Sequence, residues 1–399
     1  MSELKVNKIT PRDGTTITLG DSGDTVSIPA GVTLSGDGSN LTNLPASGKE
    51  ITESTTNPAI DTNPATGVGT LWLNKTTGNM WCLTDATAGA NVWTNLGLGT
   101  ANVTVGYDVD FLVVAGGGAG TTSGTAYMSA GGGGGGLRTS WPGGSGGGGD
   151  SEDKIQLRPG NVYTITVGGG GASHTEVGGD SSIVGTGVNI VSDGGGGGAV
   201  NPPTQLATSG GSGGGGLYPD IANSTVPGSG TANQGYDGGV GGGPGSHPCG
   251  GGGGAAEVGH DSATHGNIGG GAGKEVNIDG NSYYWSGGGG GACHSPHTAG
   301  PGGIGGGGYG MGYQTSATGS AGGSAKNPAG IDGGANTGGG AGGSTWYYSP
   351  GSNGGSGCVI LRIPTSEYPG ASSVTGNPDI TTDGTNTILT YTGTGTYTA

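Results

Sequence analysis

The sequence has little of what most globular domains use for a core or for binding nucleic acid. It contains a single phenylalanine among 399 residues, and only 30% of the chain is hydrophobic. Lysine and arginine number 11 against 27 aspartates and glutamates, which gives a formal net charge of −16. Because no basic cluster is present to displace counterions from phosphates, we exclude a nucleic-acid partner.

Long apolar segments are also missing. No apolar run reaches the roughly 20 residues of a membrane-spanning helix, and residues 1–10 lack the apolar stretch of a secretory signal. We therefore predict no membrane insertion, and synthesis in a cytoplasm without export by the general secretory route. The four cysteines, Cys82, Cys249, Cys293 and Cys358, are too scattered for a disulfide scaffold.

Catalytic patterns are missing as well. Carboxylates are few and scattered, and no Ser/His/Asp arrangement stands out. The glycine runs lack the lysine and hydroxyl residue of a phosphate-binding loop. We therefore predict that the chain is not an enzyme.

Glycine, in contrast, accounts for 106 of the 399 residues, with pure runs such as 131–136, 250–254 and 287–291. Ordinary usage is about 7%. Collagen is excluded, because the glycine spacing is irregular and only 20 prolines are present. A disordered filler remains the alternative, since a polar, glycine-rich chain buries little apolar surface to offset lost backbone entropy.

Two features favour an ordered domain. Apolar, strand-like segments at residues 108–115 and 358–363 frame the glycine-rich region. Within it, residues 154–167 alternate apolar and polar side chains on both sides of Pro159-Gly160, which predicts a β-hairpin.

Glycine runs order as the polyglycine II helix, a left-handed helix with three residues per turn, about 3.1 Å rise per residue and no internal hydrogen bonds. Their backbone groups must then bond to parallel neighbours, and only glycine permits such close approach. The predicted fold class is therefore all-β fibre segments plus a glycine-rich domain of packed polyglycine II helices framed by β-strands. We expect little or no α-helix.

Composition divides the chain into four segments. These are an amino-terminal β shaft or attachment segment at 1–48, a small tryptophan-containing β module at 49–100, the glycine-rich domain at 101–365, and carboxy-terminal β-strands at 366–399. The first segment has too few apolar residues for a core of its own, which favours an intertwined homotrimer.

The second segment contains Trp72, Trp81 and Trp93 and a predicted turn at 77–79. A packed aromatic core is the favoured interpretation of the three tryptophans, and a sugar-stacking platform is the alternative.

Aromatic residues between the glycine runs are the candidate receptor-binding residues, because exposed aromatics on rigid loops give a large contact area at low entropy cost. The alternative is that they cap the bundle ends or lie between subunits. The candidates are Trp141, Tyr218, Tyr236, Tyr283, Tyr284, Trp285, Trp346, Tyr347 and Tyr348.

Histidine and cysteine residues concentrate in two short segments, giving a candidate metal site of His247, Cys249, Cys293, His294 and His297. Imidazole and thiolate suit zinc or iron. Their spacing matches no standard motif, however, and reduced thiols with solvent-facing histidines explain the pattern equally well. We otherwise expect no cofactor.

Residues 4–9 (LKVNKI) with 13–15 (DGT), and residues 69–74 (GTLWLN), resemble segments of tail fibre proteins from tailed bacteriophages. The pairing of residues 109–118 (VDFLVVAGGG) with 354–362 (GGSGCVILR) is similar to the glycine-rich domain at the ends of such fibres. Glycine-rich tip adhesins of T-even-like phages are a more distant parallel, built on polyglycine II helices whose distal loops contact the receptor.

The resemblance implies a virion tail fibre protein, made in the host cytoplasm and released by lysis. It implies a host receptor, either an outer-membrane protein or a polysaccharide, as one partner, and other tail or baseplate proteins, bound through the amino terminus, as another. The tip adhesins cap a separate fibre, whereas this chain carries its own shaft, so their oligomeric state does not transfer. A structural spacer or filament-forming protein, and a bacterial surface adhesin, are the alternative functions.

Overall fold

The computed structural model divides the chain into two compact units, Met1–Asn102 and Val103–Ala399. The predicted shaft at 1–48 lies outside the described residues. The structure describes residues 51–62, 64–96, 106–120, 128–172, 175–201, 205–218, 224–242, 247–262, 268–294, 298–312, 331–345 and 351–399.

The described part of the first unit is a four-stranded sheet. Its strand order is β1 (Ile51–Ser54), β2 (Leu71–Asn74), β3 (Met80–Asp85) and β4 (Val92–Asn95). Strand β1 runs parallel to β2, and the other pairs are antiparallel. The turn predicted at 77–79 connects β2 to β3, where Gly78 takes a left-handed φ of 73°.

The three tryptophans of this unit pack together. Trp72 lies opposite Trp81 in the β2–β3 ladder, and its ring meets the ring of Trp93 edge to face at 5.8 Å. The Trp72 indole N–H donates to the Thr56 carbonyl at 2.9 Å. Among the described residues of this unit, Leu83 is the one hydrophobic side chain that is fully buried, so half-buried indoles supply most of its apolar packing.

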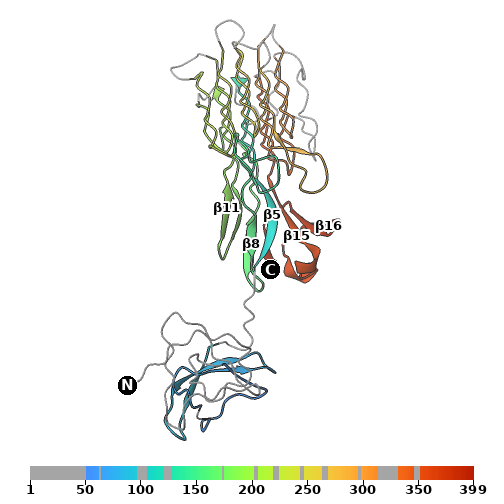
Figure 1. Cartoon of the computed structure of the whole chain (residues 1–399). Coiled ribbons are helices and arrows are strands. Elements are labelled where there is room, and N and C mark those ends of the chain that lie inside the picture. The colour runs from blue at the N-terminus through green and yellow to red at the C-terminus, as the bar shows by residue number, and fades with distance from the viewer. Residues whose placement is uncertain are drawn as a thin grey trace, which may run out of the picture. The chain divides into compact units, whose positions relative to one another are not determined.

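The second unit combines a β-sandwich at one end with a glycine bundle at the other (Figure 1). One sheet has the order β16-β17-β15-β5-β7, with β8 also paired to β5, and the other has the order β11-β10-β9-β18. The strands of the first sheet are β5 (Tyr107–Val114), β7 (Leu137–Thr139), β8 (Ile155–Leu157), β15 (Cys358–Pro364), β16 (Asp379–Asp383) and β17 (Asn386–Tyr391). Those of the second are β9 (Val162–Thr166), β10 (Ser181–Gly185), β11 (Val188–Ser192) and β18 (Gly395–Thr398).

Short elements complete the second unit. Two small ladders pair β6 (Met128–Ser129) with β12 (Val200–Asn201), and β13 (Lys274–Glu275) with β14 (Tyr284–Trp285). Two 3-10 helices, η1 (Thr365–Glu367) and η2 (Ala371–Ser373), are the only helical turns in the described part of the chain. The predicted fold class, all-β with little or no α-helix, is confirmed.

The two framing strands are confirmed and pair with each other. Strand β5 runs antiparallel to β15, with Phe111 opposite Leu361 and Val114 opposite Cys358. Alternate side chains of each strand enter the sandwich core, and the remaining ones pack around Trp285. Both faces are therefore buried, which explains why these strands have nearly continuous apolar sequences.

The hairpin predicted at 154–167 is wrong in its pairing, although both strands exist. Strand β8 pairs with β5 in one sheet, whereas β9 lies between β10 and β18 in the other. The turn at Pro159-Gly160 therefore passes from sheet to sheet. Alternation in both strands arises because each presents one face to the same sandwich core.

The polyglycine II geometry is visible in the hydrogen bonds of residues 131–136. Each amide donates to a carbonyl outside the run, with N···O distances of 2.7–3.2 Å, and amides three positions apart donate to the same neighbouring segment. A helix with three residues per turn produces this repeat. The donations are Gly131 to Gly250, Gly132 to Ala341, Gly133 to Gly196, Gly134 to Gly253, Gly135 to Gly338 and Gly136 to Asp193.

Carbonyl groups of the same run accept from three further segments, so the run lies at the centre of six neighbours. Runs 250–254 and 286–292 are likewise bonded to six segments each. Neighbouring backbone thus satisfies almost every backbone group of residues 131–136, and the Gly135 carbonyl accepts from the Ser286 hydroxyl. The neighbours of 131–136 are the segments 115–118, 193–196, 212–215, 250–253, 286–289 and 338–341.

Side chains are excluded from this run by its neighbours. A Cβ atom on Gly132 would meet the carbonyl oxygens of Gly118 and Ala119, and one on Gly133 would meet that of Ser212. None of the six glycines has a left-handed φ, so steric contact with neighbouring backbone, rather than chain conformation, requires glycine here.

Buried tyrosines in the sandwich make its stability sensitive to alkaline pH. Tyr391 donates its hydroxyl hydrogen to the Thr396 carbonyl at 3.0 Å, and the Tyr397 hydroxyl lies 2.7 Å from that of Tyr107. Burial raises the pKa of both Tyr391 and Tyr397. Because the folded-state pKa exceeds the unfolded value of about 10, the protonated hydroxyls stabilise the fold below that pH, and this stabilisation is lost as pH rises above it.

We therefore expect the free energy of unfolding to be constant near about pH 9 and to fall progressively above about pH 10. Denaturant unfolding at a series of pH values measures this. Tyr391→Phe removes one titrating group and should flatten the fall. An equally steep fall in this variant would contradict the assignment.

Candidate functional site

The chain enters and leaves the second unit at the same end, the β-sandwich. The hydroxyl of Tyr107 in β5, the first strand of this unit, bonds that of Tyr397 in β18, the last strand. The Gly160 amide donates to the Ala399 carbonyl at 2.6 Å. The first and last described residues of the unit therefore both lie at the sandwich. We call the opposite end of the bundle the free end. The described residues at this end include Asn201, Tyr218, His247 and His294.

Three of the predicted residues meet at the free end. The exposed ring of His247 lies edge to face against Tyr218, with the ring centroids 4.5 Å apart. The ring of His294 lies edge to face against that of His247, with the ring centroids 6.0 Å apart. The Asn201 side-chain amide donates to the Tyr218 hydroxyl at 2.9 Å. These residues come from separate connections between runs, and we call Tyr218, His247 and His294 the free-end cluster.

Two buried cysteines lie near this cluster. The Cys249 amide donates to the Ala292 carbonyl at 3.0 Å, which places Cys249 beside the run that leads to Cys293. Burial raises the pKa of the Cys249 thiol, and it raises the pKa of the Cys293 thiol to about 11. Both thiols are therefore protonated at neutral pH, and the thiolate is the form that binds metals.

The structure thus places four residues of the candidate metal site near one another. His297 lies outside the described residues. Within the described ranges, no group of three or more histidine, cysteine, aspartate or glutamate side chains is arranged to hold a metal ion.

A second group of predicted residues lies beside the sandwich. The Trp141 indole N–H donates to Asn277 Oδ1 at 2.7 Å, and the Arg362 guanidinium lies 4.9 Å from the centre of the indole ring. Arg362 also pairs with Asp383 at 2.8 Å. The half-buried Trp141 ring is thus fixed in orientation by a hydrogen bond at its edge and by a cation–π contact on one face.

Trp285 is at the centre of this second group and is completely buried. Its indole N–H donates to the Val276 carbonyl at 3.0 Å, and the ring of Tyr283 meets it edge to face at 6.1 Å. The apolar side chains around it come from β5, β7, β15 and β17, from Ala255 and from the segment at residues 276–278. Trp285 therefore has no surface with which to touch a partner of this chain.

The remaining predicted aromatics are half-buried or undescribed. Tyr236 and Tyr284 are each partly exposed. Trp346, Tyr347 and Tyr348 lie outside the described residues.

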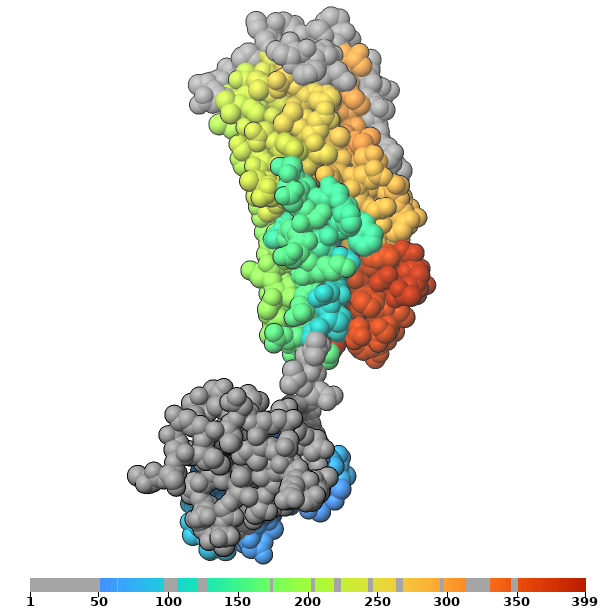
Figure 2. All heavy atoms as spheres, viewed as in Figure 1, coloured from blue at the N-terminus to red at the C-terminus, as the bar shows by residue number. Residues whose placement is uncertain are grey.

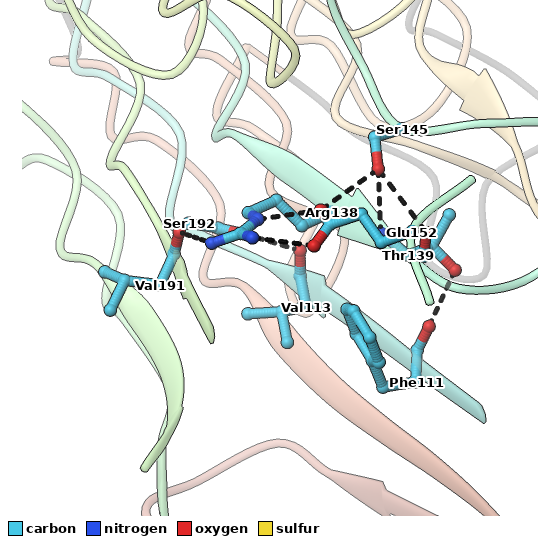
Figure 3. A network of polar contacts seen from close by, with 8 residues as sticks. All are labelled: Phe111, Val113, Arg138, Thr139, Ser145, Glu152, Val191 and Ser192. Atoms are coloured by element: carbon cyan, nitrogen blue, oxygen red, sulfur yellow. Dashed lines mark hydrogen bonds and ion pairs between the residues drawn. The ribbon is translucent and has the colours of Figure 1, made fainter. Parts of the chain in front are cut away.

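A polar network that the sequence did not reveal closes one edge of the sandwich (Figure 3). Arg138 Nε donates to Glu152 Oε1 at 2.8 Å, Nη2 donates to Oε2 at 2.6 Å, and Nη1 donates to the Val191 carbonyl of β11 at 3.1 Å. Hydrogen bonding to Glu152 is the main cause that raises the pKa of Arg138. Nothing in the spacing of residues 138 and 152 predicts this pair, because a long loop brings them together.

Loop residues next to this network line a cavity of about 480 Å³. The loop, residues 140–153, lies on the face shown in Figure 2, where its green surface separates the yellow part of the bundle from the red carboxy-terminal strands. The opposite wall comes from the turn at residues 232–234. The Leu137 amide donates to the Gln234 carbonyl at 3.0 Å, so the turn is bonded to strand β7, which leads into the loop.

A family model described as a glycine-rich domain matches residues 94–364, more than half of the chain. The chain belongs to this glycine-rich domain family. The match ends at Pro364, the last residue of β15, so the family segment includes both framing strands and the whole bundle between them. Strands β16, β17 and β18 lie beyond the match, yet they complete the two sheets of the glycine-rich domain.

No curated protein and no solved structure gave a significant match. Within the described residues, no helix has the length and apolar character required to cross a bilayer.

Proposed function

We propose that this chain is a bacteriophage tail fibre protein whose glycine-rich domain binds a receptor on the host cell through the free end of its bundle. The observation that carries the proposal is the polarity of the second unit. The chain enters and leaves this unit at the sandwich, so the described residues at the free end belong to connections between runs. Connections displayed on a rigid scaffold are the usual location of binding residues.

The free-end cluster supplies suitable chemistry for such contacts. An exposed imidazole packed against a half-buried phenol offers apolar ring area together with hydrogen-bonding atoms. Both ring types are stiff, so little side-chain entropy is lost when a partner binds. An outer-membrane protein or a surface polysaccharide fits this surface, and binding requires no catalytic group or cofactor.

The rest of the proposal concerns assembly. The amino-terminal segment would attach the fibre to other tail or baseplate proteins and hold three copies together. Three free ends presented side by side would raise the avidity for a repetitive cell surface, because the second and third contacts form at high effective concentration. The protein would then be a virion component, made in the host cytoplasm and released by lysis.

A rigid spacer is the second candidate, and one observation favours it. The interior runs satisfy their backbone groups among themselves, which would make the bundle stiff whether or not its end binds anything. The two functions differ in what happens when the free-end cluster is changed.

The test uses purified full-length protein added to susceptible cells before phage. We expect the protein to bind the cells and block adsorption. Tyr218→Leu combined with His247→Asn should raise the concentration needed for half-maximal blocking by about tenfold or more, the effect of losing a contact hot spot. Asparagine is chosen because His247 has a left-handed φ of 46°, which asparagine tolerates.

The control is Val162→Ala, an exposed residue in β9 of the sandwich, which should block as well as the wild type. Equal melting temperatures would show that both variants fold. If the wild-type protein neither binds cells nor blocks adsorption, the receptor-binding proposal is wrong. If the double variant blocks adsorption as well as the wild type, the spacer function is favoured.

A further inference from the structure

The cavity beside loop 140–153 is a separate feature from the free-end cluster. Its volume of about 480 Å³ falls within the range of about 300–1,000 Å³ typical of small-molecule sites. Arg138, Asp150 and Glu152 contribute to one side, and Asn233 and Gln234 contribute to the other.

The charges in the cavity are unequal. Arg138 and Glu152 neutralise each other through two hydrogen bonds, of 2.8 and 2.6 Å. Asp150 is exposed and makes no side-chain hydrogen bond or ion pair with any described residue. The cavity therefore carries one uncompensated negative charge.

Two amide side chains add both kinds of hydrogen-bonding group. Gln234 Oε1 accepts from the Asp193 backbone amide at 2.7 Å, which fixes the side chain and leaves its NH2 group as a donor. Asn233 supplies an amide oxygen and an NH2 group and is exposed. The loop thus contributes a carboxylate acceptor, Asp150, and the facing turn contributes amide donors and acceptors from Asn233 and Gln234.

The walls are held rigidly by local hydrogen bonds. Ser151 donates its hydroxyl hydrogen to the Trp141 carbonyl at 2.8 Å and accepts from the Gly144 amide at 3.0 Å. The Gly147 amide donates to the Ala255 carbonyl of the bundle at 2.9 Å. Asn233 lies in the turn of the second wall with a left-handed φ of 62°, a conformation that asparagine tolerates. Such a pre-formed site loses little entropy on binding.

We propose that this cavity binds a neutral hexose unit of a polysaccharide. Sugar hydroxyls both donate and accept hydrogen bonds, so a carboxylate acceptor beside two amides matches them, whereas the uncompensated charge of Asp150 disfavours uronates and other anionic sugars. The site lies on the side of the second unit rather than at its free end. It does not depend on the receptor function proposed above.

The experiment is calorimetric or saturation-transfer NMR titration of the full chain with the methyl glycosides of glucose, galactose and mannose, and with the methyl glycoside of glucuronic acid. We expect at least one neutral glycoside to bind with a Kd of about 1 mM, typical of a single small polar ligand with about −4 kcal/mol of binding free energy. The glucuronide should not bind.

Two variants test the assigned residues. Asn233→Gly removes the amide and suits the left-handed backbone, and Asp150→Asn removes the charge; each should weaken hexose binding about tenfold. Asp153→Asn changes an exposed carboxylate of the same loop outside the cavity and should bind like the wild type. Unchanged melting temperatures would show that all three variants fold.

Three outcomes would overturn the proposal. They are the absence of binding by every neutral glycoside at about 50 mM, a concentration about 50-fold above the expected Kd, undiminished binding by both cavity variants, and equal or stronger binding of the glucuronide. Hexose binding without blocking of adsorption would leave this site in place and remove only the receptor proposal, so the two failures are distinguishable.

Discussion

Replacing Gly132 by alanine is expected to destabilise the glycine-rich domain by about 3 kcal/mol or more, at the upper end of the cost of overpacking a dense interior. The added methyl group would meet the carbonyl oxygens of Gly118 and Ala119, which belong to the neighbouring run. Neither oxygen is at the end of a flexible side chain, so relief requires moving a whole run. Denaturant unfolding measures the loss.

Gly169→Ala is the matched control, because no atom lies within 4 Å of the added methyl position and the φ of Gly169 is not left-handed. This substitution should be neutral or stabilising by about 0.4–1 kcal/mol, since alanine restricts the unfolded chain. The neighbouring Gly170 would place a methyl group against the Gly354 carbonyl, so Gly170→Ala should resemble Gly132→Ala. Equal stabilities for alanine at 132 and at 169 would contradict the steric account.

Trp285→Ala is expected to cost about 3–5 kcal/mol, the usual loss when a buried tryptophan is truncated. The ring is fully buried. Side chains of β5 and β15 pack on it, and so do side chains of the loop at residues 276–283. Its removal also leaves the Val276 carbonyl without its donor. Thermal or denaturant unfolding measures the effect.

Tyr284→Ala serves as the control for Trp285, because it changes the adjacent residue of β14, which is half-buried. We expect a loss of less than about 1.5 kcal/mol, in line with an ordinary partly exposed position. A hexose or cell-binding defect in Trp285→Ala at a temperature where the variant is fully folded would contradict a purely structural role for this residue.

The sequence was sufficient for the parts of the fold that depend on local pattern. Strands β5 and β15 are long, apolar on both faces and placed at the borders of the glycine runs, so their existence could be predicted. The polyglycine II helix could also be predicted, because pure glycine runs have few other ordered structures available.

Pairing was harder, because it depends on which edges other strands occupy. The segments around Pro159-Gly160 alternate as a hairpin does, and alternation is equally required of two strands facing one core from opposite sheets. Strand β9 instead pairs with β10, the next strand along the chain, and with β18, the last one.

The candidate site shows the same division. The grouped histidines and cysteines were interpreted either as a metal site or as reduced thiols with solvent-facing histidines, and the structure places His247 near His294 although 47 positions separate them in the numbering. The sequence did not predict that Trp285 would be fully buried while Tyr283 stays partly exposed. Both belong to one short aromatic segment, and the packing of Trp285 against side chains from several distant elements decides which ring is buried. Arg138 and Glu152 were missed because no periodic pattern relates the ends of an irregular loop.

The threefold repeat of bonds in residues 131–136 has a consequence for how such a bundle changes in length. Deleting one residue from a run would rotate every following amide by a third of a turn and direct it to a different neighbour. Deleting three residues would remove one whole turn and leave each remaining amide with its partner run. The length of a run can therefore change only in steps of one whole turn of three residues if its bonds are to be kept.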